Sequence, residues 1–290
     1  MSTRLPPRAG AGPDFAADDP ELAALKQKIQ RERGFNCEFY KSKCLHRRIS
    51  VRMRARGRTS FSSYAALLDD DPHEYDVLLD TLTINVTKFF RNTETWEAIE
   101  RDVVPALFET AAREPGMRRQ KLWSAGSASG EEAYSLSMLL HEHAERHGAE
   151  GLLGRFQIVG TDIDRRSLEA AGAGVYPELS FAETSAARQA RWFEGAAPPL
   201  RLRDEARRNV RFDRLDLISD EYDTGYALIL CRNVLIYFDR EIQERLFERF
   251  YEALRPGGFL VLGKVETMLG PARARFRAIN HRERIFRRPD

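Results

Sequence analysis

The sequence of this 290-residue chain has few cysteines and no long apolar segment. Its three cysteines, Cys37, Cys44 and Cys231, are odd in number and lack C-x-x-C spacing, which argues against a disulfide framework and a zinc site. No apolar run approaches the roughly 18 residues that a membrane span requires. The first twenty residues contain no apolar core, so no secretory signal is expected. These absences predict a protein of the reducing cytoplasm.

The G-x-G-x-x-G turn of dinucleotide-binding enzymes is also missing. In its place, residues 123–135 read WSAGSASGEEAYS, with Gly126 and Gly130 four residues apart. A short apolar strand precedes these glycines, and an apolar helix follows them. A strand, a glycine turn and a helix in this order form the ligand-binding corner of a doubly wound α/β sheet.

Two carboxylates, Glu131 and Glu132, begin the helix of this corner. A helix N-terminus normally attracts phosphate because its first backbone N–H groups have no partners. Two glutamates there would repel a pyrophosphate and suit a ligand with positive charge. S-adenosylmethionine carries a sulfonium and an ammonium and has no phosphate. The corner is therefore interpreted as a methyl-donor site.

The net charge of only +2 is unevenly distributed. Residues 21–60 contain twelve Lys/Arg and three Glu, a formal charge of +9. Basic side chains recur there at three- and four-residue steps, so they share one face of an expected helix: Lys43, Arg47, Arg54 and Arg58. Such a face is either a solvated surface or a docking surface for an acidic partner, and the sequence leaves both open.

Composition and periodicity divide the chain into several parts. Hydrophobic residues make up 42% and charged residues 31%, which is typical of a globular protein of about two domains. We expect a disordered tail over residues 1–20, a helical domain over 21–84, a linker and linking helix over 85–118, and an α/β domain over 119–290.

Four apolar segments of the α/β domain alternate with helical stretches, which predicts a parallel sheet with right-handed crossovers. The expected strands are residues 121–124, 156–161, 227–231 and 259–262. Residues 174–212 break the alternation. Apolar and basic residues alternate there around turn signals, which predicts a small antiparallel β-insert that includes residues 209–212.

Polar residues follow two of these strands, at the edge where an α/β sheet binds its ligand. Asp162 ends one strand and is placed to accept hydrogen bonds from ribose hydroxyls, although it could be a turn residue and Asp164 competes for the role. Arg232 and Asn233 abruptly interrupt an apolar run, which is costly unless they face a ligand or a partner. Tyr237, taken alone, is better explained as a packing aromatic.

A further segment, N-V-T-K-F-F-R over residues 85–91, precedes the α/β domain. By itself it would be a hinge between domains, with Phe89 and Phe90 in the core. Taken together with the glycine turn and the polar strand ends, the segment is more informative. The order NVTKFFR, WSAGSASGEEAYS, GTDID, CRNVLIYF and LRPGGFLVLG resembles the CheR-type chemotaxis receptor methyltransferases, over about residues 35–268.

The resemblance implies a Rossmann-like methyltransferase domain with an inserted small antiparallel β-subdomain, preceded by an all-α domain. It implies transfer of a methyl group from S-adenosylmethionine to glutamate side chains of chemoreceptor signalling domains. The residues implied to bind the cofactor are Asn85, Thr87, Arg91, Gly126, Glu131, Asp162, Asp216, Leu217, Arg232 and Asn233. Arg91 and Tyr237 would flank the transferring methyl as the catalytic pair. Asp216 stands where the family often has Asn.

The resemblance also gives the basic helix face a partner, because receptor signalling domains are helical bundles rich in glutamate. Lys43, Arg47, Arg54 and Arg58 would steer these bundles into place. Some relatives are tethered to a receptor C-terminal pentapeptide through the β-subdomain. The turn at residues 195–199 is shorter than the corresponding loop of tethered members, so we expect an enzyme that does not depend on the peptide.

Three other interpretations were weighed. A methyltransferase acting on nucleic acid would use the basic region to bind phosphates, but that region lacks interleaved aromatics, and no N-P-P-Y-type motif is present. A non-catalytic sensor of S-adenosylmethionine would not require both Arg91 and Tyr237. His141, His143 and His147 could form a metal site, but surface histidines near a helix end are commoner, and no metal is predicted.

Overall fold

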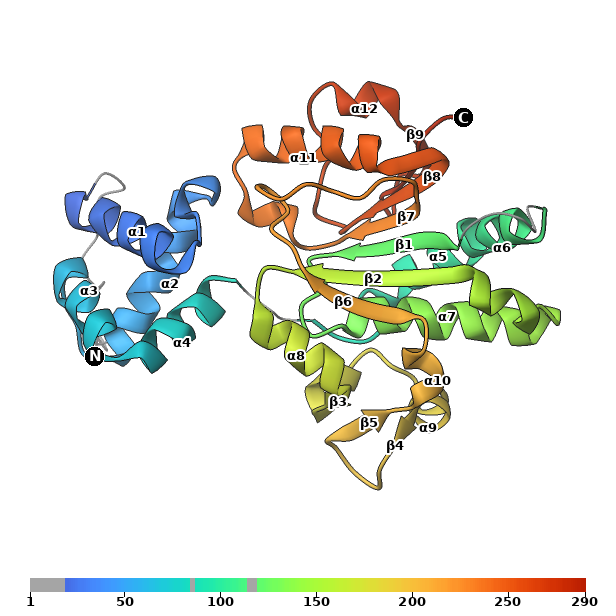
Figure 1. Cartoon of the computed structure of the whole chain (residues 1–290), viewed down its shortest axis with the longest axis horizontal. Coiled ribbons are helices and arrows are strands. Elements are labelled where there is room, and N and C mark those ends of the chain that lie inside the picture. The colour runs from blue at the N-terminus through green and yellow to red at the C-terminus, as the bar shows by residue number, and fades with distance from the viewer. Residues whose placement is uncertain (1–18, 84–86, 114–118) are drawn as a thin grey trace, which may run out of the picture. The chain divides into compact units, whose positions relative to one another are not determined.

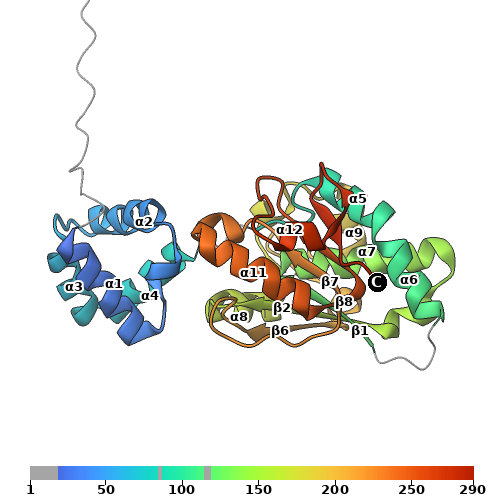
Figure 2. The same cartoon turned by 90° about the horizontal axis from the view of Figure 1, so that it is seen from above.

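The computed structural model describes residues 19–83, 87–113 and 119–290 (Figure 1). The chain forms two compact units, Met1–Leu82 and Thr83–Asp290. Asn85 and residues 1–18 lie outside the described residues. The first unit is helical (Figure 2), and its elements are α1 (Pro20–Arg33), η1 (Cys37–Phe39), α2 (Ser42–Ala55), α3 (Phe61–Asp70) and α4 (Pro72–Leu82).

Helix α2 buries the apolar stripe that the sequence predicted. Leu45, Ile49 and Met53 are at most 2% exposed, because residues four apart lie on one helix face. The prediction that Arg58 shares the opposite face is wrong. The helix ends at Ala55, and Gly57 adopts a left-handed φ of 63°, which places Arg58 in the turn beyond the helix.

The remaining basic residues of the predicted face are exposed: Lys43, Arg47 and Arg54 on α2, with Arg58 exposed in the following turn. No ion pair to an acidic side chain is recorded for these four among the described residues. Arg52 and Arg56, by contrast, pair with Glu74 inside the same unit. Part of the formal +9 is therefore neutralised internally, whereas Lys43, Arg47, Arg54 and Arg58 leave positive charge at the surface.

Glu74 is the buried polar centre of the helical unit. Its side chain is 1% exposed and accepts hydrogen bonds from Arg52 Nε at 3.0 Å, Arg56 Nη1 at 2.9 Å and the Tyr64 hydroxyl at 2.7 Å. Burial opposes ionisation of this carboxyl, but Arg52, Tyr64 and Arg56 together hold its pKa below the ordinary 4.5. The contacts join α2, α3 and α4.

Replacing Glu74 with glutamine is expected to lower the free energy of unfolding of the helical unit by about 1.5–3 kcal/mol, because charged hydrogen bonds are lost from a buried site. A depressed pKa means that this stabilisation is present above pH 4.5 and is lost as the pH falls below it. Urea unfolding followed by circular dichroism at several pH values measures both effects. The exposed Glu38→Gln serves as control, and equal stability of the two variants at pH 7 would contradict the assignment.

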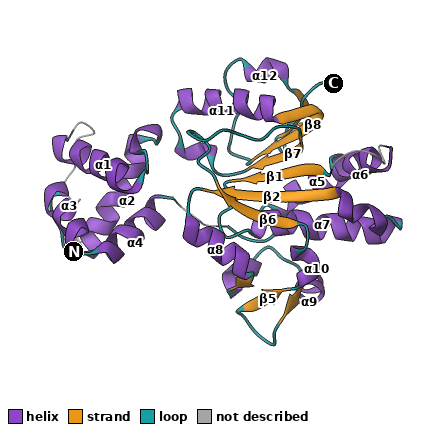
Figure 3. Ribbon diagram, viewed as in Figure 1, coloured by secondary structure: helices purple, strands orange, loops and turns teal. Residues whose placement is uncertain are grey.

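The second unit is built on a seven-stranded sheet with the order β6-β2-β1-β7-β8-β10-β9. Figure 3 shows these strands gathered into one sheet with helices around it. The strands are β1 (Gln120–Ala125), β2 (Phe156–Asp162), β6 (Val210–Arg214), β7 (Tyr226–Cys231), β8 (Leu254–Leu262), β9 (Arg277–Asn280) and β10 (Ile285–Arg287). The first five pair in parallel, which confirms the predicted parallel sheet; β10 pairs antiparallel with both β8 and β9.

Helices cover this sheet because alternate side chains of each strand point to opposite faces. Leu122 of β1 belongs to one apolar cluster with Leu136 and Leu140, whereas the neighbouring Trp123 packs its ring 5.7 Å from that of Phe250. The helices and turns of this unit are α5 (Thr93–Asp102), α6 (Val104–Arg113), α7 (Glu131–His147), η2 (Glu150–Arg155), α8 (Arg165–Ala173), η4 (Leu235–Tyr237), α11 (Arg240–Ala253) and α12 (Ala272–Arg275).

A separate three-stranded antiparallel sheet of order β3-β5-β4 lies between α8 and β6 in the chain. Its elements are β3 (Val175–Tyr176), η3 (Glu178–Phe181), α9 (Ala186–Trp192), β4 (Phe193–Glu194), β5 (Leu200–Leu202) and the short α10 (Asp204–Arg207). The predicted insert is thus present, but residues 209–212 do not belong to its sheet. Residues 210–212 form part of β6, which pairs in parallel with β2, and Asn209 lies in the turn before it; Phe212 packs against Tyr134 of α7. No helix among the described residues is long and apolar enough to cross a membrane.

Candidate functional site

The predicted site residues lie where the central parallel strands end. Strand β1 is centrally placed between β2 and β7, with Ala125 opposite Thr161 and Ser124 opposite Leu230. The glycine turn, Asp162 and the Arg232–Asn233 pair therefore follow three adjacent strands at one edge of the sheet. This is the ligand-binding edge of an open α/β fold.

The glycine turn between β1 and α7 approaches the turn that follows β7. Gly126 has a φ of 76°, and a Cβ there would lie 2.5 Å from Cγ2 of Val234. Gly130 has a φ of 90° and would bring a Cβ to 2.8 Å from the Phe212 ring. Both positions need glycine for the backbone conformation and for space. The two turns thus form one closely packed wall.

Asp162 is buried at the end of β2, with 9% exposure. Its carboxylate accepts hydrogen bonds from the backbone N–H groups of Ala128 at 2.9 Å and Asp164 at 3.0 Å, so it ties the glycine turn to its own strand. Burial raises the pKa of this carboxyl. The competing Asp164 caps α8 instead, because its side chain accepts a hydrogen bond from Arg166 N.

Asp216 and Leu217 lie at the same edge of the sheet as Asp162, because a backbone hydrogen bond holds their segment there. Leu215 N donates to the carbonyl of Asp162 at 3.0 Å, which brings the segment after β6 beside the end of β2. The Asp216 carboxylate accepts from Ile218 N at 2.8 Å and from the Ser219 hydroxyl at 2.9 Å, so it shapes its own turn. Leu217 is buried.

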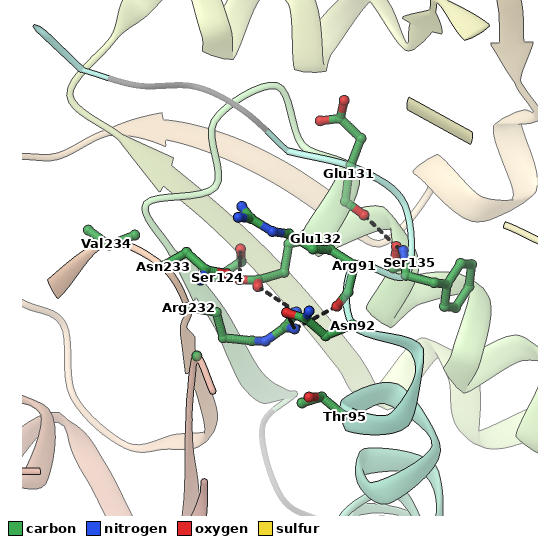
Figure 4. Close-up of polar contacts among 12 residues, drawn as sticks. Arg91, Asn92, Thr95, Ser124, Glu131, Glu132, Ser135, Arg232, Asn233 and Val234 are labelled. Carbon is green, nitrogen blue, oxygen red and sulfur yellow. Dashed lines mark hydrogen bonds and ion pairs between the residues drawn. The ribbon is translucent and has the colours of Figure 1, made fainter. Parts of the chain in front are cut away.

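Of the two glutamates that begin α7, Glu131 is buried and Glu132 is mostly buried, with a side-chain exposure of 12%, and the two have different partners. Glu131 accepts hydrogen bonds from the hydroxyls of Ser129 at 2.7 Å and Ser180 at 3.0 Å. Glu132 accepts from the Ser124 hydroxyl at 2.8 Å and pairs with Arg232 at 3.3 Å (Figure 4). Burial raises the pKa of both carboxyls, and the charge of Arg232 opposes the rise at Glu132. The corner therefore concentrates acidic groups, as the sequence predicted.

The segment that leads into α5 is both core and site. Phe89 and Phe90 are fully buried, and Phe89 contacts the rings of Tyr176, Phe181 and Phe193 from the insert. This confirms the interpretation of the two phenylalanines as core residues. Thr87 begins the described part of the segment and is half-buried.

Arg91 lies in a turn with an unusual backbone. Its neighbours Phe90 and Asn92 have φ values of 54° and 60°, which non-glycine residues rarely adopt. Phe90 N donates to the Ser135 hydroxyl of α7 at 2.9 Å. Arg91 is half-buried, and its side chain extends from the turn toward the side of the site where Asn233 is drawn (Figure 4).

Arg232 is almost completely enclosed, with a side-chain exposure of 2%. Its Nη2 donates to the carbonyl of Arg91 at 2.6 Å and to Asn92 Oδ1 at 3.3 Å, while Nη1 faces Glu132. Its two terminal nitrogens therefore face protein groups, whereas its Nε is buried without a hydrogen-bond partner among the described residues.

The turn after β7 carries the other two predicted residues. Asn233 has a φ of 62°, and its Oδ1 is buried without a hydrogen-bond partner among the described residues. Tyr237 ends the short η4 and is half-buried. An unpartnered buried amide oxygen costs free energy unless a ligand supplies a donor. Asn233 Oδ1 is thus a candidate ligand acceptor.

Glu266 is a site-shaping residue that the sequence analysis missed. Its carboxylate is 3% exposed and accepts hydrogen bonds from four backbone N–H groups, those of Asn233, Val234, Leu235 and Gly263, at 2.6–3.0 Å. It holds the turn after β7 in place. Glu266 lies just past the carboxyl end of β8. Asp162 was predicted because it lies at the carboxyl end of a strand, and the same criterion would have indicated Glu266.

Two of the three histidines of α7, His141 and His143, are buried, which corrects their interpretation as surface residues, whereas His147 is exposed. His141 and His143 are 9% and 8% exposed, with ring centroids 5.6 Å from Trp192 and 4.7 Å from Phe108. Helix α7 is covered on the side that was expected to face solvent. Among the described residues, no group of three His, Cys, Asp or Glu could hold a metal ion.

Comparison with known protein families matches both units. The family model "CheR methyltransferase, SAM binding domain" covers residues 85–285, and "CheR methyltransferase, all-alpha domain" covers residues 20–83. Every residue that was implied to bind S-adenosylmethionine lies within the first of these matches.

Similar proteins span nearly the same length. The chain is 33% identical to a chemotaxis protein methyltransferase of Listeria monocytogenes, over 84% of this chain and 88% of that protein. It is 31% identical to the chemotaxis protein methyltransferase of Escherichia coli, over 87% and 86%. It is also 33% identical to the putative methyltransferase Cher3 of Pseudomonas putida, over 93% and 97%. With its acidic glycine turn, its Arg91 segment and both domains matched, the chain belongs to the CheR methyltransferase family and is an S-adenosylmethionine-dependent chemotaxis methyltransferase.

Proposed function

We propose that this enzyme transfers the methyl group of S-adenosylmethionine to glutamate side chains on the cytoplasmic signalling domains of chemoreceptors. The products are glutamyl methyl esters and S-adenosylhomocysteine. The observation that carries the proposal is Arg91, a cation on a closely held turn at the ligand-binding edge of the sheet. A cation there suits an acceptor that is itself an anion.

The residues of the edge fit the cofactor. The close approach of Gly126 to Val234, the unpartnered Oδ1 of Asn233 and the buried carboxylates of Glu131 and Asp162 offer a flat wall and acceptors for a cationic nucleoside. We assign the binding site to Asn85, Thr87, Arg91, Gly126, Glu131, Asp162, Asp216, Leu217 and Asn233, with Arg232 holding the carbonyl of Arg91. When bound, the cofactor supplies an electrophilic methyl group on a sulfonium.

Methyl transfer requires the protein mainly to align the acceptor carboxylate with the methyl group. A glutamate side chain is ionised at pH 7, because its ordinary pKa is about 4.3, so no general base is required. Arg91 holds the incoming carboxylate by a charged hydrogen bond without taking a proton. Tyr237 orients the carboxylate through its hydroxyl. The remaining contribution is to hold the two reacting groups in line and to exclude water.

The acceptor class is tested by a choice of substrates. The enzyme is incubated with methyl-labelled S-adenosylmethionine and a receptor cytoplasmic fragment, the same fragment with its surface glutamates replaced by glutamine, or RNA. Label on the unmodified fragment alone supports the proposal, because only it offers surface glutamate carboxylates as nucleophiles. Equal labelling of the glutamine fragment, or labelling of RNA, would refute it.

The exposed basic residues of the helical unit provide a docking surface for the acidic receptor. Reversing the charge of Arg47 and Arg54 together is expected to raise the KM for the receptor fragment about tenfold or more, because steering and rim contacts become repulsive. The Kd for the cofactor should not change, since these residues belong to the other unit. A loss of cofactor affinity would contradict the assignment. Lys43 and Arg58 contribute in the same way.

The cytoplasmic location follows from the proposed substrate, since receptor signalling domains lie in the cytoplasm. The short turn at residues 195–199, between β4 and β5, supports an enzyme that does not require a receptor C-terminal pentapeptide. Micromolar binding of such a pentapeptide in a calorimetric titration would overturn this part of the proposal.

A further inference from the structure

We infer that Arg232 and Glu183 are positioning residues that clamp the strained turn of Phe90, Arg91 and Asn92, so that the Arg91 side chain is directed into the site. The inference rests on the proposed function, because it concerns the residue that would hold the acceptor carboxylate. It gives Arg232 a role through Arg91 in place of a side-chain contact with the cofactor. It also makes the β-insert part of the catalytic apparatus.

The turn needs to be held from outside. Phe90 and Asn92 both have positive φ values, 54° and 60°, on either side of Arg91. Bulky residues such as phenylalanine are disfavoured in this region because Cβ crowds the backbone. Such strain persists at functional sites only where surrounding contacts fix the conformation. Without those contacts the turn would relax and Arg91 would move.

Arg232 supplies the first of these contacts. One guanidinium nitrogen, Nη2, donates to the Arg91 carbonyl at 2.6 Å, while Nη1 faces Glu132 at 3.3 Å (Figure 4). The carboxylate of Glu132 balances the buried charge and is itself held by Ser124. The planar guanidinium of arginine contacts the Arg91 carbonyl and the Glu132 carboxylate with two separate nitrogens. A lysine has only one nitrogen for the two contacts.

Glu183 supplies the second contact, from the segment between η3 and α9 of the insert. Its Oε2 accepts the backbone N–H of Asn92 at 2.6 Å, and its Oε1 lies 3.8 Å from Lys88 Nζ. Phe89 N donates to the Ser180 carbonyl of the same insert at 3.0 Å. The turn is therefore bound on one side by the strand-end Arg232 and on the other by the insert.

Burial separates the positioning role from a cofactor contact. The Arg232 side chain is 2% exposed. Its Cζ lies 5.6 Å from the centroid of the Trp96 ring, and both of its terminal nitrogens face protein groups. Its Nε is buried and has no hydrogen-bond partner among the described residues. The cofactor would meet Arg91 and Asn233, and Arg232 would act behind them.

The first test uses Arg232→Lys, which keeps the positive charge beside Glu132. Three quantities are measured on the full chain: kcat for methylation of a receptor fragment, the Kd for S-adenosylhomocysteine, and amide hydrogen exchange over residues 87–95. The clamp predicts a kcat at least tenfold lower, a Kd within threefold of wild type, and faster exchange in this segment. A weaker Kd with unchanged exchange would identify a direct cofactor contact and overturn the inference.

The second test uses the half-exposed Glu183, whose replacement leaves no buried charge unpaired. Glu183→Ala is expected to lower kcat about tenfold and to speed exchange of the Asn92 amide, whereas Glu183→Gln keeps an acceptor oxygen and restores most of both. The matched control is Glu178→Ala, the same change at an exposed residue of the same insert. Unchanged kcat in Glu183→Ala, or an equal loss in Glu178→Ala, would overturn the inference.

Failure of the proposed function would be distinguishable. If the wild-type enzyme methylates no receptor fragment, the function is wrong, but exchange over residues 87–95 still reports the turn directly. Faster exchange in Arg232→Lys and Glu183→Ala, with none in Glu178→Ala, would then still support the clamp. Unchanged exchange in all three variants would refute the clamp whatever the acceptor.

Discussion

Replacing Arg91 with alanine is expected to lower kcat for receptor methylation by about 10²–10³-fold, the loss typical when one charged or hydrogen-bonding contact to the reacting group is removed. The reason is geometric. Arg91 is the cation carried by the strained turn, and contacts from Phe90 N to Ser135 and from Arg232 to the Arg91 carbonyl hold the backbone from which its side chain extends. Without it the acceptor carboxylate has no charged partner to align it with the methyl group.

The measurement is the initial rate of methyl transfer from labelled S-adenosylmethionine at saturating receptor fragment. Arg91→Lys, which keeps the charge but not the planar fork, should fall between the alanine variant and wild type. Arg101→Ala is the matched control. Arg101 is an exposed arginine of the next helix, and its ion pair among the described residues is with Asp102. A near-normal rate for Arg91→Ala would remove this residue from the mechanism.

Replacing Gly126 with alanine is expected to abolish detectable cofactor binding, with a rise in Kd of about 100-fold or more. The new Cβ would lie 2.5 Å from Cγ2 of Val234, a branched side chain with little freedom to move. The glycine turn would have to shift away from the turn after β7, and both turns line the proposed cofactor site. A displacement of this size removes several ligand contacts together.

Gly148→Ala is the control for this variant. Gly148 ends α7 with a φ of 63°, close to the 76° of Gly126, but a Cβ there would meet no atom within 4 Å. It imposes a similar backbone cost without the steric clash. Calorimetric titration with S-adenosylhomocysteine should show near-normal affinity for Gly148→Ala and none for Gly126→Ala. Comparable affinities for the two variants would mean that the two turns do not form the cofactor wall.

The parts of the fold that were predicted from sequence are those with a local signal. The parallel strands and the α7 helix have continuous apolar patterns. The glycine turn has two glycines four residues apart between a strand and a helix, an arrangement that few other structures require. The stripe of Leu45, Ile49 and Met53 is likewise buried as its periodicity predicted. In each case the pattern and the packing reflect the same periodic geometry.

The errors arose where tertiary contacts override a local pattern. Residues 209–212 alternate as an edge strand of an antiparallel insert would, yet β6 pairs in parallel with β2 because Phe212 packs over Gly160 and Tyr134. Arg58 has helical spacing, but one left-handed glycine ends α2 before it. His141 and His143 were expected at the surface because they lie near a helix end, but Trp192 and Phe108, which come from other segments of the chain, cover them.

The contacts that organise the site were the least predictable. Arg232 and Glu183 meet the Arg91 turn from positions 141 and about ninety residues away in the chain. Glu266 gathers four backbone N–H groups from two separate turns. Motifs identified the residues of these turns, but which side chains hold them together depends on the three-dimensional packing.

The central claim is that the product is a glutamyl methyl ester, and its chemical lability tests this most directly. Receptor fragment labelled by the enzyme is treated with mild alkali, and volatile methanol is collected. Release of nearly all the label as methanol is the predicted result, because carboxyl methyl esters hydrolyse under these conditions. Label that stays on the acceptor after alkali would contradict the account and assign the methyl group to a nitrogen or another stable position.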